Sequence, residues 1–201
     1  MINIPLDGQY QSDSLSISNQ LNTNCYINVP QTQSFSQANL FGTAGVKKIS
    51  TTGLIRQVNR GSHVKAGKPY FVNGETLYRQ DLSTVAGVEV FTNVALGTIA
   101  GTNRVSMADN GTQLMVLIPG GNGYIVNEAA SPVFQQITDT DLTANGAPQF
   151  VKFVDSFFVV TTNTKKFIKS ASNDGLSWNA LDFGTAESDP DDIVSLIVSK
   201  N

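Results

Sequence analysis

The feature that most constrains the fold is a repeat of 43 residues in the pattern of short apolar segments. Equivalent segments begin near Tyr70, Gln113 and Ser156, so consecutive starts are 43 residues apart. Each segment lies in a unit of about four short runs, separated by Gly, Asn, Asp and Pro, which is the pattern of strands and turns. A repeat of about 40 to 50 residues with four strands is typical of a β-propeller blade. The sequence therefore predicts an all-β, antiparallel, propeller-like fold.

We expect about three complete units from Ile49 onward, followed by an incomplete fourth. In the first unit the Asn73-Gly74 pair predicts a type I′ hairpin turn, because both central residues of that turn need positive φ. The apolar run at 193–199 predicts the first strand of the fourth unit, which would pair back with the N-terminal region or continue in a longer protein. The expected strands are 69–72, 75–79, 88–91 and 94–97, then 104–108, 113–118, 124–127 and 133–137, then 150–154, 156–161, 166–170 and 174–178.

Residues 1–46 differ from the rest of the chain. They are rich in Gln and Ser and show little alternation, apart from a short apolar run at 24–29. We expect them to form an extended N-terminal arm, and residues 47–201 to form the propeller-like domain. The sequence has neither a basic segment followed by an apolar run at its N-terminus nor a stretch of about 18 apolar residues. We therefore expect a soluble protein that is made in a cytoplasm.

Charge and cysteine content limit the partners. Charged residues make up 14% of the chain, against a typical share of roughly 25%. The formal net charge is −3, and the Lys/Arg clusters do not exceed the pairs Lys47-Lys48 and Lys165-Lys166. This argues against tight nucleic-acid binding but allows DNA to pass without sequence-specific contacts. With Cys25 alone and one histidine, neither an intrachain disulfide nor a Cys/His zinc site can form, and we expect Cys25 to be a small buried hydrophobic residue.

The sequence offers no catalytic, cofactor-binding or metal-binding residues. His63 lies in the polar segment 60–67, which we predict to be a flexible surface loop without a nucleophile paired to it. The Gly-rich run 119–123 lacks the Lys-Ser/Thr of a phosphate-binding loop and predicts a hairpin tip, as does 109–111. The acidic segments 187–192 and 139–141 could supply oxygen ligands, but their spacing favours turns whose carboxylates cap backbone amides. We therefore expect a protein that is not an enzyme and has no small-molecule substrate.

One hairpin suggests an alternative from another functional class. Residues 172–178 are similar to the Asp-box of sialidase-type propellers, with Asn173 in the place of the Asp, and even a complete box is a structural element. A sialidase would also need three converging arginines, which could come only from Arg56, Arg60, Arg79 and Arg104. A carbohydrate-binding or sialidase-like propeller is therefore the alternative, and a secreted β-sandwich adhesin is a third interpretation that the repeat argues against.

Three segments resemble the packaged-DNA stabilization proteins, or tail hubs, of short-tailed phages. Segments 24–30 and 40–46 are similar to the family's N-terminal pattern, although Ala44 stands where the family usually has Pro. Segments 101–108 and 123–126 resemble an arginine-led blade strand and its returning strand. The most specific match is 167–192, which is similar to the family pattern S-x-x-D-G-x-x-W-x-A-L-D-F-A-x-A-E-S-x-P-D.

The resemblance implies a structural role in the virion. A member of this family would assemble as a homo-oligomeric ring, a hexamer, below the portal and its head-tail adaptor. It would close the portal channel after DNA packaging, retain the genome and anchor the tail needle or fibre and the tailspikes. Double-stranded DNA would pass through the channel, and the protein would be made in the host bacterial cytoplasm. Because known members are longer than this chain, the resemblance also implies an N-terminal portion of such a protein.

Overall fold

The computed structural model describes residues 25–28, 39–43, 45, 47–54, 57–130, 133–186 and 191–199. The chain divides into two compact units, residues 1–49 and 50–201. In the first unit, β1 (Cys25–Asn28) and β2 (Asn39–Gly42) pair antiparallel, with Cys25 opposite Gly42. The expected burial of Cys25 concerns a side chain outside the described part of the chain. No helix among the described residues is long and apolar enough to cross a membrane.

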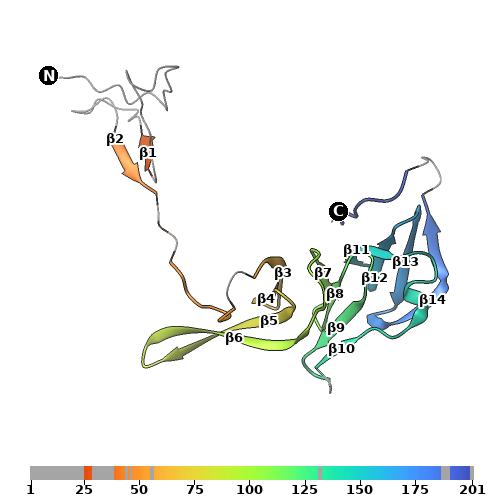
Figure 1. Cartoon of the computed structure of the whole chain (residues 1–201), viewed down its shortest axis with the longest axis horizontal. Coiled ribbons are helices and arrows are strands. Elements are labelled where there is room, and N and C mark those ends of the chain that lie inside the picture. Colours follow the sequence, from red (N-terminus) through yellow and green to blue (C-terminus); the bar gives the residue numbers. More distant parts are fainter. Residues whose placement is uncertain are drawn as a thin grey trace. The chain divides into compact units, whose positions relative to one another are not determined.

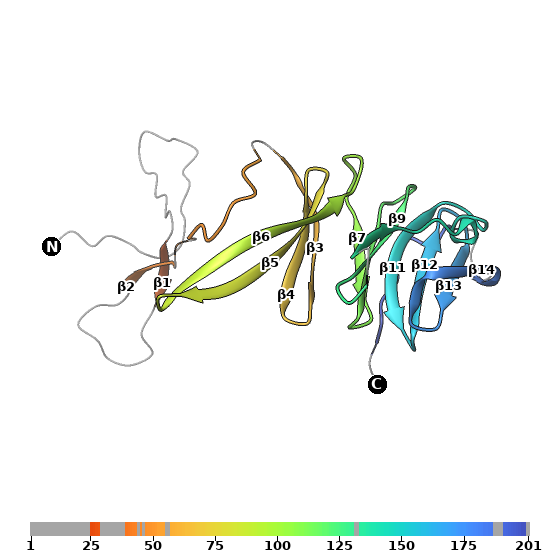
Figure 2. The same ribbon diagram turned by 90° about the horizontal axis from the view of Figure 1, so that it is seen from below.

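The second unit contains three four-stranded antiparallel sheets, which confirms the predicted fold class (Figures 1 and 2). In each sheet the strands pair in chain order, as in propeller blades. The first sheet contains β3 (Asn59–Lys65), β4 (Lys68–Asn73), β5 (Thr76–Val85) and β6 (Val88–Thr98). The second contains β7 (Ser106–Asp109), β8 (Gln113–Leu117), β9 (Gly123–Asn127) and β10 (Phe134–Gln136). The third contains β11 (Pro148–Val154), β12 (Phe157–Thr162), β13 (Lys166–Ala171) and β14 (Asp174–Thr185).

The 43-residue repeat corresponds to the second strand of each sheet. These strands, β4, β8 and β12, begin at Lys68, Gln113 and Phe157. The first strands lie side by side and are joined directly. The Val105 N–H donates to the Arg60 carbonyl (3.0 Å), and the Ser106 hydroxyl accepts from the Val151 N–H (3.0 Å). β3, β7 and β11 are therefore the inner strands around which the sheets are arranged.

The middle sheet is buried on both faces. All five residues of β8 are buried, and its four apolar side chains enter two different hydrophobic clusters alternately. Leu114 and Val116 pack toward the first sheet, and Met115 and Leu117 pack toward the third. Burial of each such side chain stabilises the fold by roughly 1.5–3 kcal/mol. The continuous apolar run of β8 thus follows from its place between two sheets.

Two predictions about the first sheet were wrong. The segment 60–67 is mostly strand, because β3 pairs with β4 along nearly its whole length. The first hairpin turns at Gly74-Glu75 and not at Asn73-Gly74, since Asn73 pairs with Thr76. Of these residues Gly74 alone has positive φ (+59°), which is the requirement at the first central position of a type II′ turn.

The run at 193–199 was expected to be the first strand of a fourth blade-like repeat, but the structure has no strand there. A single strand needs a neighbour for its backbone hydrogen bonds, and the described contacts of this segment include one long bond, from the Ile193 N–H to the Thr164 carbonyl (3.5 Å). The described residues thus form three four-stranded sheets and the two-stranded β1–β2 sheet, and residues 193–199 add no strand to them.

Candidate assembly surface

A long hairpin projects from the first sheet. β5 and β6 have ten and eleven residues, but β4 pairs with β5 only from Asn73 to Tyr70. Residues 80–93 of the hairpin therefore extend beyond β4 as a two-stranded ribbon, which we call the β5–β6 arm (Figures 1 and 2). Residues 82–90 are all exposed. The exposed apolar side chains of the arm are Leu82 (58%), Val85 (59%), Val88 (64%) and Val90 (38%).

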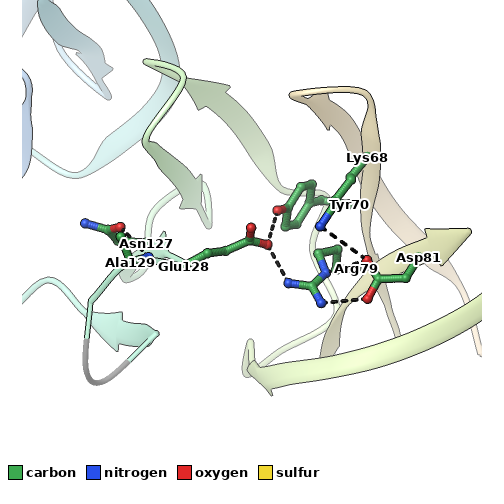
Figure 3. A network of polar contacts seen from close by, with 7 residues as sticks. All are labelled: Lys68, Tyr70, Arg79, Asp81, Asn127, Glu128 and Ala129. Carbon is green, nitrogen blue, oxygen red and sulfur yellow. Dashed lines mark hydrogen bonds and ion pairs between the residues drawn. The ribbon is translucent and has the colours of Figure 1, made fainter.

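A network of charged residues holds the root of this arm to the second sheet (Figure 3). Arg79 of β5 binds the Asp81 carboxylate through two hydrogen bonds, from Nε (2.8 Å) and Nη2 (2.6 Å). Its Nη1 binds Oε1 of Glu128 (2.6 Å), which follows β9. The same oxygen accepts a bond of 2.5 Å from the Tyr70 hydroxyl, and Lys68 lies 3.7 Å from Asp81. We call these five residues the root network.

The protonation states within the root network reinforce it. The bonds from Arg79 lower the pKa of Asp81. Burial alone would raise the pKa of Glu128, but the bonds from Tyr70 and Arg79 outweigh it and leave that pKa below its usual value. Burial, together with Glu128, raises the pKa of Tyr70, and the two carboxylates raise the pKa of Arg79. Both carboxylates are thus ionised and both donors are protonated near neutral pH, so the arm is held at its root by charge-assisted hydrogen bonds.

The outer edge of the third sheet is covered by side chains. η1 (Thr140–Leu142), a single 3₁₀ turn, lies along β14. The Asp139 carboxylate accepts from the Trp178 N–H (2.8 Å), and the Asp141 carboxylate accepts from the Ala180 N–H (3.1 Å). Asn145 donates to the Ala180 carbonyl (2.8 Å). The acidic segment 139–141 therefore caps two backbone amides of β14, as the sequence predicted.

The outer edge of the second sheet is short. β10 has three residues, and its Phe134 ring stacks on Tyr124 with ring centroids 5.3 Å apart. A short edge strand offers little backbone for pairing with another chain. In the described part of the chain, β6 is the other long outer strand, and its Asn93 side chain accepts a hydrogen bond from the Ser50 hydroxyl (3.3 Å).

A histidine-carboxylate pair joins β3 and β7. His63 lies on β3, and its Nε2 is 2.5 Å from Oδ2 of Asp109, at the end of β7. Asp109 also accepts from the Gly111 N–H (2.9 Å), which confirms the predicted hairpin turn. A cavity of about 460 Å³ lies beside this pair, and Lys152 and Phe153 of β11 also line it. His63 thus links two inner strands.

The other sequence motifs are structural elements. The run 119–123 forms the tip between β8 and β9, where the Gly120 N–H donates to the Pro148 carbonyl (2.7 Å). In the Asp-box-like hairpin, Asp174 accepts from the Leu176 N–H (3.0 Å), and the buried Trp178 donates to the Gly175 carbonyl (2.9 Å). The described residues contain no group of three or more potential metal-binding side chains. Of the acidic segment 187–192, residues 187–190 lie outside the described part of the chain.

Two of the arginines that the sialidase alternative requires make structural contacts within the fold. Arg60 is 3% exposed, and its guanidinium donates to four backbone carbonyls, at distances between 2.5 and 3.2 Å. Desolvation by burial lowers its pKa. Arg79 is occupied by Asp81 and Glu128. Arg104 is exposed, and Arg56 lies outside the described residues. The guanidiniums of Arg60 and Arg79 are therefore not available to bind a substrate carboxylate.

Sequence reasoning missed the β5–β6 arm and the root network. The sequence has strand-forming residues on both sides of Ala86-Gly87, but this turn lacks the Asn or Asp that usually signals a two-residue hairpin. The contact between Arg79 and Glu128 joins two sheets across 49 positions, and no local pattern encodes it.

The comparisons with known proteins agree with the architecture. No curated protein sequence matches this chain. A family model does match it over residues 2–201; it is named for phage stabilisation and described as Bacteriophage P22 Gp10, beta-propeller. Because the match spans nearly the whole chain and the described sheets have the form of blades, the protein belongs to this phage stabilisation family.

Proposed function

We propose that this protein is a tail hub of a short-tailed phage, which closes the portal channel after DNA packaging and retains the genome. The observation that carries this proposal is the family match over residues 2–201, together with three blade-like sheets. The matched family consists of phage structural proteins that stabilise packaged DNA, and this match supports a virion location for the protein. The hub would be a homo-oligomeric ring, a hexamer, that contacts the portal or its head-tail adaptor on one side.

On the other side the ring would anchor the tail needle or fibre and the tailspikes. We assign residues 1–46 the role of an extended arm toward neighbouring proteins, and residues 47–201 the role of a rigid propeller-like scaffold. The low charge of the chain suits surfaces along which DNA moves without specific contacts. Synthesis in the host bacterial cytoplasm would precede assembly into the virion tail.

The proposed role is mechanical and needs neither a catalytic residue, a cofactor nor a metal. The polar groups that could suggest chemistry are engaged in structural contacts: Arg60 with backbone carbonyls, Asp139 and Asp141 with β14, and His63 with Asp109. The protein would therefore have no small-molecule substrate.

Deletion of the gene tests this proposal. Capsids that lack the protein should package DNA and then lose it, and they should lack the needle and the tailspikes. Electron microscopy of the particles and a nuclease-protection assay of their DNA measure both effects. If particles without the protein retained their DNA and carried complete tails, the proposal would be rejected.

A further inference from the structure

The chain contains four Asn-Gly steps, and the structure describes all of them. They lie at 73–74, 110–111, 122–123 and 145–146. Asparagine is a chemically labile residue, and it reacts most readily before glycine, because no side chain then hinders the following backbone nitrogen. The surroundings of the four steps therefore decide which of them can react in the folded protein.

At three of the steps the glycine N–H is already engaged. Gly74, Gly111 and Gly146 donate to the Val58 carbonyl (3.0 Å), the Asp109 carboxylate (2.9 Å) and the Thr143 carbonyl (3.1 Å). A nitrogen whose N–H is bonded in this way must first lose that bond before it can turn toward the side chain that precedes it.

The asparagine side chains of the same three steps are bonded as well. The Asn145 amide donates to the Ala180 carbonyl (2.8 Å) and accepts from Nζ of Lys166 (3.0 Å). The other two amides are held in the same manner, Asn73 by Thr52 and Gln57, and Asn110 by Thr112, Gln113 and Asn173. These three side chains are thus fixed by at least two hydrogen bonds each.

The step at the tip between β8 and β9 differs from the other three. Asn122 is exposed, and its side chain makes no hydrogen bond to the described residues. The bonds here involve the two carbonyls: that of Asn122 accepts from the Ile118 N–H (3.0 Å), and that of Gly123 accepts from the Ile137 N–H (2.8 Å). Because Ile118 and Asn122 form a bonded pair, Leu117 and Gly123 form a non-bonded one, so the Gly123 N–H does not point to β8.

We propose that Asn122 is a site of spontaneous deamidation in the folded chain. The Gly123 nitrogen attacks Cγ of Asn122 and loses its proton, a new C–N bond closes a five-membered succinimide, and the side-chain nitrogen leaves as ammonia. Water then opens the ring at one of its two carbonyls. The products carry aspartate or isoaspartate at position 122, and in isoaspartate the main chain runs through the side chain. Water is the co-reactant, and neither an oxidant nor a cofactor is needed.

The isoaspartate product should disturb the start of β9. Its main chain is longer by a carbon atom just before Gly123, a buried residue that fits closely: a Cβ built there would lie 2.8 Å from Cδ1 of Ile137. The lengthening also falls at the bond between Ile118 and Asn122. We expect the isoaspartate form to unfold at a lower temperature than the parent. The aspartate form should unfold near the temperature of the parent, because its carboxylate reaches water.

Peptide mapping by mass spectrometry tests the proposal on the purified 201-residue chain. One sample is incubated in the folded state at mildly alkaline pH, and a second is incubated in urea that unfolds it. In the folded sample Asn122 should convert at least about tenfold faster than each of the other three asparagines. This ratio corresponds to about 1.4 kcal/mol, the order of one or two hydrogen bonds. In urea the four rates should be similar, since all four residues precede glycine.

Asn122→Gln is the matched control. It keeps an amide at the tip, but the longer side chain closes the corresponding ring far more slowly. After the same incubation, the parent should show a fraction that unfolds at lower temperature and is labelled by an isoaspartyl methyltransferase. Asn122→Gln should show neither.

Two results would overturn the proposal. One is conversion at another Asn-Gly step of the folded chain that is as fast as conversion at Asn122. The other is an Asn122 that stays intact in the folded sample while it reacts in urea. The proposal rests on the hydrogen bonds around Asn122 and not on the proposed function, so either can fail without the other.

Discussion

Two outer strands of similar length have very different surroundings. β14, with twelve residues, carries a buried tryptophan, and its Trp178 and Ala180 N–H groups donate to carboxylates of the segment around η1. β6, with eleven residues, lies half beyond its own sheet and exposes the side chains of its tip. Both strands have the alternating, β-branched and aromatic character of strands. The difference lies in what the rest of the chain supplies to each edge.

This comparison separates stability from assembly. Residues of β14 that face the core contribute to the free energy of unfolding, since Trp178 lies in a hydrophobic cluster with residues of the other three strands of the third sheet and of the second sheet. Residues 82–90 of the arm are exposed, so unfolding breaks few of their contacts and their substitution should change the free energy of unfolding little. Mutations in the two regions should therefore affect different measurements.

The largest expected difference is between two aromatic residues. Trp178→Ala should lower the free energy of unfolding by about 3–5 kcal/mol, because Trp178 is 6% exposed and packs in the core. Phe91→Ala should cost less, about 1–2 kcal/mol, since its ring is only partly buried and belongs to neither hydrophobic cluster. Urea denaturation of both variants at a concentration where the chain is monomeric checks this. Equal costs would mean that the arm belongs to the folded core.

Removal of the cover from β14 should have the next largest effect. Asp139→Ala leaves the Trp178 N–H and the Asp141 N–H without their acceptor, so we expect a loss of about 2 kcal/mol. It should also make β14 competent for strand pairing, which would appear as new self-association in light scattering. Asp182→Ala is the control, because its contact with Lys169 is exposed and 3.7 Å long and should contribute less than about 0.5 kcal/mol.

The root network predicts a dependence on pH. Glu128→Gln should destabilise the fold by about 1 kcal/mol at neutral pH, a value reduced by the partial exposure of the Glu128 side chain (31%). Folding lowers the pKa of Asp81 and Glu128 from ordinary values of 3.8 and 4.5. Their contribution is therefore complete above these values and is lost as the pH falls through the lowered ones.

The measurement is the free energy of unfolding of the parent and of Glu128→Gln at several pH values. The difference between them should be constant from pH 7 to about pH 5 and should shrink in more acidic solution. A difference that grows on acidification would contradict the assignment of an ionised Glu128 to this network. Hydrogen exchange should also be faster in the arm of Glu128→Gln, since its root is then held less firmly.

The sequence could predict the blades because their signals are local. The repeat, the apolar run of β8 and the turn at 109–111 each follow from neighbouring residues, and the structure confirms them. The segment 60–67 was wrongly predicted as a loop because two of its buried positions carry charged residues, Arg60 and Lys65, and charged residues usually indicate exposed positions. Arg60 is stable there because four carbonyls, three of them from residues 99–103, accept its hydrogen bonds, and no local pattern reveals such partners.

The smallest expected change in the free energy of unfolding comes from replacing valine by threonine in the arm. The same substitution can be made in the third sheet, so the two regions are compared with one chemical change. Val88→Thr keeps the β-branched shape and the strand preference of the side chain and adds a hydroxyl. At the arm tip, where Val88 is 64% exposed, that hydroxyl reaches water, so the free energy of unfolding should change by less than about 0.5 kcal/mol. Val160→Thr places the same hydroxyl at a fully buried position of the third sheet and should cost about 1–3 kcal/mol. If urea denaturation at low concentration gave similar costs for both, the arm would be a folded part of the core, and its exposed apolar residues could not be assigned to a partner.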